Sequence, residues 1–191
     1  HAFTFEREQI LAEAVAEEGH GDNVAPAMFG GLVIVATDEE GPIAQKVTLP
    51  PLRVVVCVPE FHFLTSQARS VLPELLRRAD AIANIGRTAL MVEALRGQDY
   101  RLLARAMTDR IHEPYRLPII PGALAARQAA LCAGAAAVSL SGAGPGMIAF
   151  SAGNHQEIGQ AMVNAFTTAG LTARFWVLDT LDDGATLTSW A

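Results

Sequence analysis

The sequence predicts an α+β fold in which helices cover a mainly antiparallel sheet. Two observations lead to this class. The middle of the chain has the apolar spacing of helices, and the last third follows the order strand, glycine loop, strand, helix, strand. Early apolar runs supply further strands for the same sheet. Helices grouped apart from antiparallel strands are typical of α+β proteins, and no internal repeat or linker divides the chain.

The first third is predicted to contain one helix and several strands. Residues 6–18 form the helix, because Leu11, Ala14, Val15 and Glu18 share one face at helical spacing. Strands are expected at residues 31–37, 46–49 and 52–59, with a turn at 38–42. The last of these runs is almost continuously apolar, which is typical of a strand that is buried on both faces.

The rest of the chain is predicted from caps, glycine stops and apolar runs. Thr65 or Ser66 can cap a helix that continues to about Leu72. Further helices are expected at residues 77–96, 100–111, 121–133 and 156–169, and strands at 137–140, 147–151 and 173–178. The segment 113–116 contains proline and is expected to interrupt the helical pattern. The polar segment from Asp179 is expected to be a loose tail.

The composition indicates a globular protein and argues against two classes of partner. The 191 residues are 51% hydrophobic and 18% charged. A net charge of −6 argues against general nucleic-acid binding, because phosphate contacts need a basic face. No apolar run is as long as a membrane span, and the first residues lack the basic and apolar regions of a signal peptide. We therefore expect neither nucleic acid nor membrane as a partner.

The two cysteines, Cys57 and Cys132, both lie in apolar runs. Two buried free thiols in a reducing compartment explain them better than a disulfide or a metal site. The chain has no CxxC motif and no His/Cys cluster, which argues against a zinc site. These observations favour a cytoplasmic protein.

The most informative segment is a glycine-relieved break between the first helix and the first strand. It places Glu18, His20, Asp22 and Asn23 within six residues. The helix macrodipole disfavours Glu18 at a C-terminal end, so this carboxylate is either solvated or has a cation partner. A carboxylate is a hard oxygen ligand suited to Mg²⁺, and a second carboxylate nearby can hold an ammonium group. An ordinary loop histidine at His20 and a simple turn at Asn23 remain open alternatives.

A glycine loop and two arginines are the other candidates. Residues 141–146 place three glycines and Ser141 between two strands, which exposes N–H groups to a ligand. Because neither a lysine nor a helix follows, this is not a GxxxxGK[ST] loop, and a β-hairpin with a wide turn explains it at least as well. Arg69 and Arg116 have the planar guanidinium that suits a carboxylate. For each arginine alone, a surface charge is the simpler explanation.

Five stretches occur in order along the chain: EGHGDNVAPAMFGG (18–31), LTSQARSVLP (64–73), IANIGR (82–87), EPYR with LPIIPG (113–122) and SLSGAGPGMIAF (139–150). Together they resemble homoserine kinase, a branch of the GHMP small-molecule kinases. The HGDNVAP and EPYR segments are characteristic of the homoserine branch, and the SGAGP loop is common to the superfamily. The resemblance extends from about residue 7 to residue 180.

The resemblance implies a reaction and a set of site residues. The reaction is ATP-dependent phosphorylation of the homoserine hydroxyl to O-phosphohomoserine, with Mg²⁺, in threonine biosynthesis. Glu18 matches the Mg²⁺ ligand, and Asp22 matches the aspartate that binds the homoserine ammonium. No catalytic base is identified. The remaining matches are the pocket residues His20, Asn23 and Thr65, the carboxylate-binding Arg69 and Arg116, and the nucleotide-site support Ser141, Gly142, Ala143 and Gly144.

The resemblance also implies a C-terminal portion of such an enzyme. The principal phosphate loop of the family, a PxxxGLGSSAA-type segment, does not occur in these 191 residues. We therefore expect residues 1–36 to be a remnant of the N-terminal kinase domain and residues 37–191 to form the ferredoxin-like C-terminal domain, without useful activity alone. The loop departs from the usual SGSGP-[ST] pattern at Ala143 and Gly146. Two hydroxyls are lost there, which puts side-chain contacts from the loop in question but does not affect its backbone role.

Two other functions stay open at this point. The first is a GHMP kinase for another small alcohol, although Asp22 and the two arginines would then lack an ammonium and a carboxylate to bind. A non-catalytic amino-acid-binding regulatory module is the second alternative. The apolar strand at 53–58 would allow a homodimer, which the family often forms.

Overall fold

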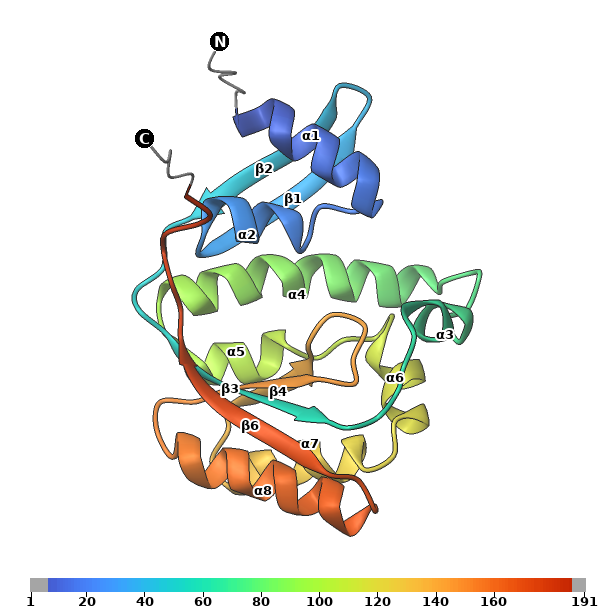
Figure 1. Ribbon diagram of the computed structural model, residues 1–191, viewed down its shortest axis with the longest axis vertical. Helices are drawn as coiled ribbons and strands as arrows, with labels where there is room; N and C mark the ends of the chain where they lie inside the picture. The colour runs from blue at the N-terminus through green and yellow to red at the C-terminus, as the bar shows by residue number, and fades with distance from the viewer. Residues whose placement is uncertain (1–6, 187–191) are drawn as a thin grey trace, which may run out of the picture. The chain divides into compact units, whose positions relative to one another are not determined.

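The computed structural model describes residues 7–186, which belong to two compact units (Figure 1). The first unit combines the chain up to Pro51 with the segment from Thr180 onward, and the second comprises Leu52–Asp179. The assignment of residues 1–36 and 37–191 to two kinase domains stays a prediction. Among the described residues, no helix has both the length and the apolar character needed to cross a membrane.

The first unit consists of two helices and a β-hairpin. Its elements are α1 (Arg7–Glu18), α2 (Val24–Phe29), β1 (Leu32–Asp38) and β2 (Gly41–Val47). The hairpin is antiparallel, with Leu32 opposite Val47. On α1, Leu11 is buried while Ala14 and Val15 are half-buried, as the helical spacing predicts. The early strands were expected to join the main sheet, but β1 and β2 form a separate two-stranded sheet.

The described part of the predicted loose tail, residues 180–186, belongs to the first unit and is bound to it, so the prediction was wrong for this part, while residues 187–191 lie outside the described residues. The Gly31 N–H donates to the Leu181 carbonyl over 2.8 Å, and the Ala185 N–H donates to the Ala27 carbonyl over 2.9 Å. Gly30 has a φ of +71°, and a Cβ at this position would collide with the backbone of Asp182. The FGG sequence is thus needed for the close approach of two backbones, which apolar patterning does not reveal.

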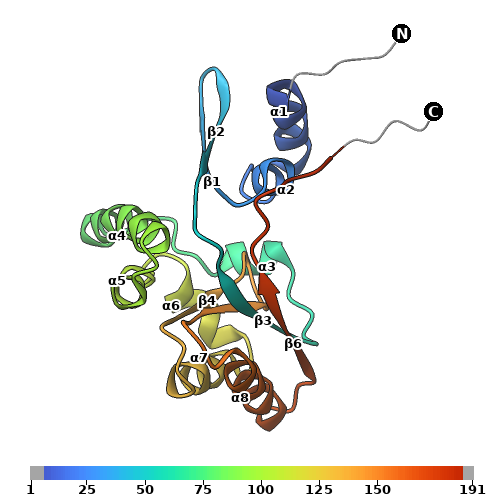
Figure 2. The same cartoon turned by 90° about the vertical axis from the view of Figure 1, so that its left-hand side faces the viewer.

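The second unit is built on a four-stranded antiparallel sheet. Its strands are β3 (Arg53–Pro59), β4 (Ala137–Leu140), β5 (Met147–Phe150) and β6 (Ala173–Asp179), in the order β4-β5-β3-β6. The helices α7 (Ala123–Cys132) and α8 (His155–Thr168) cover one face of this sheet (Figure 2). The order β3-α7-β4-β5-α8-β6 is the ferredoxin-like arrangement. The predicted α+β class is confirmed.

The core of the second unit lies between this sheet and its two helices. Phe166, Met162 and Ile158 of α8 are fully buried against Val55 and Met147. Cys57 is also buried, and desolvation raises the pKa of its thiol to about 12. Cys132, which was expected to be buried, is exposed at the end of α7. Both thiols are free, as predicted.

Four helices and a short 3-10 turn lie between β3 and α7. They are α3 (Thr65–Ser70), α4 (Arg78–Arg96), α5 (Tyr100–Ala106), α6 (Glu113–Arg116) and the turn η1 (Leu117–Ile119). The cap of α3 is Leu64 instead of Thr65 or Ser66, and the Gln67 side chain accepts from the Leu64 N–H over 3.1 Å. The helix α5 ends at Ala106, five residues before the expected Ile111.

The segment 113–116 forms the helix α6 and not the predicted interruption. Pro114 is compatible with this helix because it occupies the first turn, where a missing N–H breaks no intrahelical hydrogen bond. The helix is only four residues long, so its position depends on contacts with other elements.

Candidate functional site

In the first unit, the acidic break brings three predicted residues together. Nδ1 of His20 lies 2.5 Å from Oδ1 of Asp22, and Nε2 of His20 lies 3.9 Å from Oε1 of Glu18. The contact with Asp22 is close but lacks hydrogen-bond alignment, because Nδ1 has no partner that meets the angular criteria of a hydrogen bond. The Glu18 and Asp22 side chains are 53% and 70% exposed. Both carboxylates can therefore reach a ligand while His20 lies between them.

The backbone around the break is held by close packing. Gly21 is buried, and a Cβ at this position would meet Cγ1 of Val35 at 2.7 Å and Cγ2 of Val15 at 3.3 Å. A larger residue would therefore push the segment away from α1 and β1. Asn23 lies in a turn directly before α2 and makes no side-chain cap, so the turn alternative for this residue is confirmed. Its exposed side chain adds a polar group beside Asp22.

The donor set of the acidic break fits a cation that also has ligands outside the protein. Within residues 7–186, no group of three or more His, Cys, Asp or Glu side chains is arranged as a metal site. Mg²⁺ usually takes only one or two carboxylates and completes its octahedron with water and phosphates. A single exposed carboxylate at Glu18 is compatible with that mode. Its role as a Mg²⁺ ligand stays a prediction.

In the second unit, Arg69 and Arg116 lie close enough to affect each other. Burial lowers the pKa of the Arg116 guanidinium, Asp109 opposes this change, and the charge of Arg69 adds to it. Nε of Arg116 donates to the Ala68 carbonyl of α3 over 3.0 Å. Arg69 follows Ala68 directly, and Thr65 lies one turn earlier on α3. Two neighbouring guanidinium groups are suited to binding one anion between them.

The free groups of Arg116 strengthen that interpretation. Nε of Arg116 donates to the Ala68 carbonyl. Within the described part of the chain, the Nη groups of Arg116 have no hydrogen-bond acceptor. A guanidinium has five N–H donors, so four of them remain for a ligand. The backbone contact therefore orients the fork without using the face that recognises a carboxylate.

The helix α6, which carries Arg116, is capped by Asp109. Oδ1 of Asp109 accepts from the Ile111 N–H over 3.1 Å, and Oδ2 accepts from the N–H groups of His112 and Glu113 over 2.5 and 2.6 Å. Asn84 of α4 adds a fourth hydrogen bond over 2.5 Å. Burial by itself raises the pKa of Asp109, but these hydrogen bonds outweigh it, and the pKa lies below its ordinary value.

A buried carboxylate, that of Glu113, makes further contacts that hold α6 in place. Glu113 is only 5% exposed. Its Oε1 accepts from the Leu140 N–H at the end of β4 over 3.0 Å, and its Oε2 contacts Nη1 of Arg127 over 3.0 Å. Both oxygens thus have partners, which a buried charge requires.

The glycine loop is a hairpin loop between β4 and β5. Leu140 pairs with Met147, and the Ser141 N–H donates to the Gly146 carbonyl over 2.8 Å. Of the two interpretations of this loop, the β-hairpin with a wide turn is therefore the one that the structure adopts. Gly144 has a φ of +87°, and a Cβ there would lie 3.0 Å from Cδ1 of Ile120, so a glycine is needed. The role of residues 141–144 beside a nucleotide stays a prediction.

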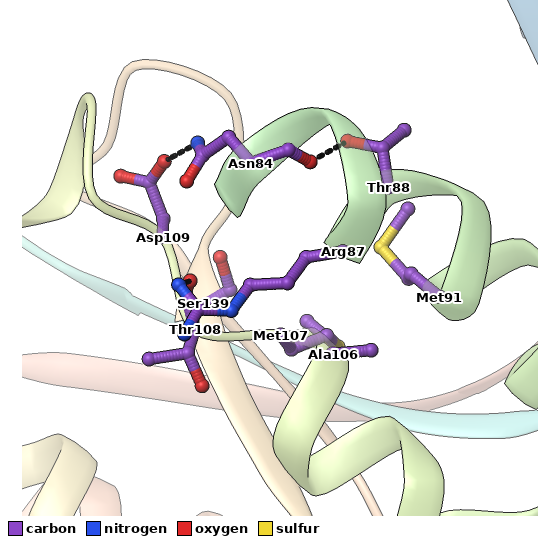
Figure 3. Close-up of a pocket in the computed structure, with 9 residues that line it drawn as sticks. All are labelled: Asn84, Arg87, Thr88, Met91, Ala106, Met107, Thr108, Asp109 and Ser139. Carbon is purple, nitrogen blue, oxygen red and sulfur yellow. Dashed lines mark hydrogen bonds between the residues drawn. The ribbon is translucent and has the colours of Figure 1, made fainter. Parts of the chain in front are cut away.

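Two pockets of the second unit lie next to Asp109, which lines both of them. The first, of about 140 Å³, lies between α4 and the segment that links α5 to α6 (Figure 3). Arg87 donates to the Thr108 carbonyl over 2.9 Å, and Asn84 reaches Asp109 there. The second, of about 180 Å³, is lined in part by Glu113 and Arg127. Neither pocket is lined by Thr65, Arg69 or Arg116.

The predicted residues thus form two groups, one in each unit. The structure brings Glu18, His20 and Asp22 together, and it brings Arg116 to the helix of Arg69. The meeting of the two groups around one substrate stays a prediction.

Sequence reasoning missed the residues that support Arg116, namely Asp109, Asn84, Glu113 and Arg127. Asn84 and Glu113 lie within the IANIGR and EPYR stretches, and their place in these family-like stretches was the one sequence signal that could have marked them as important.

Comparison with protein families identifies the second unit. Residues 91–168 match the model described as GHMP kinases C terminal. The matched segment begins within α4 and ends with α8, and it contains α6 and the glycine hairpin.

Whole proteins of similar sequence extend the match to nearly all of the chain. The homoserine kinase of Moorella thermoacetica is 44% identical over 178 residues, which are 93% of this chain and 60% of that protein. The homoserine kinase of Desulfitobacterium hafniense is 41% identical over 181 residues, with 94% and 61% covered. The chain therefore spans about three fifths of the length of these curated relatives.

A solved structure gives the same result. The crystal structure of homoserine kinase from Cytophaga hutchinsonii matches with a TM-score of 0.84 and 32% identity, over 94% of this chain and 59% of that one. The mevalonate kinase of L. major shares the fold, with a TM-score of 0.68 at 16% identity. The resemblance to homoserine kinases drawn from the sequence is confirmed. The chain belongs to the GHMP kinases and carries their C-terminal domain.

Proposed function

We propose that this chain contributes the amino-acid-binding part of a homoserine kinase, which transfers the γ-phosphoryl group of ATP to the homoserine hydroxyl. The observation that carries the proposal is the pair formed by Arg69 and Arg116. Arg116 is oriented by a backbone carbonyl next to Arg69, and its Nη groups remain free for an anion. A substrate with a carboxylate needs such a pair, whereas a simple alcohol or a sugar does not.

The other end of the substrate needs an acceptor for its ammonium group. Asp22 has an exposed carboxylate beside His20 and is the proposed partner. Contacts at both ends of a small amino acid would leave the hydroxyl in one orientation, which lowers the entropy cost of phosphoryl transfer. No catalytic base is assigned to this chain, because positioning and charge stabilisation account for most of the catalysis in phosphoryl transfer.

ATP and Mg²⁺ are the proposed cofactors. Glu18 would hold the Mg²⁺, which neutralises charge on the phosphates when it is bound. The glycine hairpin at 141–144 would support the nucleotide site through its backbone. Since the 191 residues contain no PxxxGLGSSAA-type segment, we propose that this chain alone has no useful kinase activity. A place in threonine biosynthesis and a cytoplasmic location are further predictions of the resemblance.

A coupled assay of ADP release tests the proposal. The intact protein should phosphorylate homoserine and should be inactive with mevalonate and galactose, which have no ammonium group. This chain alone, purified and assayed in the same way, should release no ADP above background. Preference of the intact protein for an alcohol without an amino-acid head group would overturn the proposal. Calorimetry without ATP separates the alternative of a non-catalytic module, which would bind the amino acid but never turn it over.

A further inference from the structure

The helix that carries Arg116 cannot hold its own position. The helix α6 has four residues, and helices of this length are unstable without outside contacts. Its backbone contributes little, because the Tyr115 and Arg116 N–H groups both donate to the one carbonyl of His112 over 3.1 Å. The placement of the arginine fork must therefore come from side chains that tie α6 to larger elements.

The Glu113 side chain ties α6 to the core through contacts that are separate from the Asp109 cap. Its carboxylate is buried between the last residue of β4 and Arg127 of α7, with both contacts at 3.0 Å. The strand β4 pairs with β5 in the central sheet, and α7 packs on that sheet. Glu113 thus fixes the start of α6 relative to two rigid elements at once.

The chemistry of this contact suits positioning better than simple packing. An apolar side chain at the same place would avoid the desolvation of a charge. It would also leave the Leu140 N–H without an acceptor, since this group is buried and is bonded to Glu113. A carboxylate with two directed partners defines both the location and the rotation of α6.

Arg116 follows Glu113 by three residues on the same helix, so any rotation of α6 is transmitted to its guanidinium. We propose that Glu113 is a positioning residue for carboxylate recognition: the Leu140 N–H and Arg127 hold its carboxylate, and α6 in turn directs Arg116 to the Ala68 carbonyl and the shared anion site. This inference rests on the proposed function of the arginine pair.

Steady-state kinetics on the intact protein test the inference. Glu113→Gln keeps the size of the side chain and one acceptor but removes the charge that faces Arg127. We expect the KM for homoserine to rise about tenfold, in line with loss of one charged partner at a buried site, while the KM for ATP changes less than about twofold. The matched control is Glu93→Gln, which breaks an exposed contact with Arg96 on α4 and should change neither constant.

A double-mutant cycle separates positioning from general destabilisation. In the Arg116→Ala background the group through which Glu113 acts is gone, so adding Glu113→Gln should leave the KM for homoserine unchanged within about twofold. An equal rise in both backgrounds would overturn the proposal. So would equal rises in the KM values for homoserine and ATP.

A second variant keeps the test valid if Glu113→Gln does not fold. Arg127→Lys retains a positive charge at a partly exposed position, and it should raise the KM for homoserine in the same direction by a smaller factor. An unchanged KM in this folded variant would contradict the proposal. The wild-type assay distinguishes the two hypotheses: absence of homoserine turnover refutes the proposed function, whereas normal wild-type turnover with unaffected variants refutes only the role of Glu113.

Discussion

At the scale of single residues, Arg116 combines two tasks that are often divided between residues. One donor holds the side chain against α3, and the others remain for a ligand. Replacement of Arg116 by alanine in the intact protein should weaken homoserine binding by about 2–4 kcal/mol, as expected when a charged partner is lost at a desolvated site. The KM for homoserine measures this loss, and an unchanged value would count against the assignment.

Asp109 gives a prediction for the dependence of stability on pH. Its pKa in the folded protein is lowered by hydrogen bonds that outweigh its burial. A lowered folded pKa means that the stabilisation is complete above the unfolded value of about 3.9 and is lost as the pH falls through the folded value. Asp109→Asn should therefore destabilise the protein at pH 7.

Urea unfolding of the wild type and of Asp109→Asn at several pH values checks this sign. The difference in unfolding free energy between them should begin to shrink below about pH 3.9, where the carboxyl of the unfolded chain takes up a proton, and should be lost as the pH falls through the lower pKa of the folded protein. A difference that stays constant down to acid unfolding would show that the cap contributes through its shape alone.

At the scale of elements, local patterns predicted the sheet well. The strand β4 has the predicted bounds, β5 and β6 differ from the prediction by one residue at their C-terminal ends, and α8 differs by one residue at each end. Apolar alternation and glycine stops are properties of the segment itself, so they can be recognised without the fold. The acidic break was also found from sequence, because four polar residues and two glycines occur together there.

The errors concern elements that depend on distant partners. The helix α6 is stabilised at its start by Asp109, which is held by Asn84 of another helix and accepts from the N–H groups of His112 and Glu113. Residues 181–182 are held in place because their backbone meets Gly30 and Gly31, about 150 residues earlier in the chain. Neither contact leaves a periodic signal in the sequence.

The tail contact gives a test at this scale. Gly30→Ala should lower the stability of the first unit by about 1–3 kcal/mol, because the residue has a positive φ and its Cβ would meet the backbone of Asp182. Lys46, whose Nζ contacts the Phe29 carbonyl and Asp182, reinforces the same junction. Thermal unfolding measures the change.

Gly153→Ala is the matched control, because no atom of the structure lies within 4 Å of the added Cβ. This variant should unfold within about 0.5 kcal/mol of the wild type. Equal stability of the Gly30 and Gly153 variants would show that the tail does not pack on the first unit in solution.

At the scale of the whole chain, exposed apolar side chains predict self-association. Ile82 and Ile85 on α4 are 62% and 72% exposed, and Trp176 and Leu178 on β6 are each 46% exposed. Each pair lies on one face of its own element, and exposed apolar patches often mark an interface. We expect this chain to form dimers or larger species at micromolar concentration.

Sedimentation velocity measures the oligomeric state and so tests this prediction. The double variant of Ile82→Ser and Ile85→Ser should shift the protein toward the monomer, and Leu131→Ser, which removes one less exposed apolar side chain on α7, should not. A wild-type chain that sediments as a well-behaved monomer would contradict the prediction.

The central hypothesis is that one acidic and two basic side chains, which belong to different units of this chain, bind the two charged ends of one amino acid. A crystal structure of the intact protein with homoserine tests it most directly. We predict that the ammonium group lies within hydrogen-bond distance of Asp22 and that the carboxylate lies between Arg69 and Arg116. Homoserine bound elsewhere, with these three side chains facing solvent, would contradict the hypothesis.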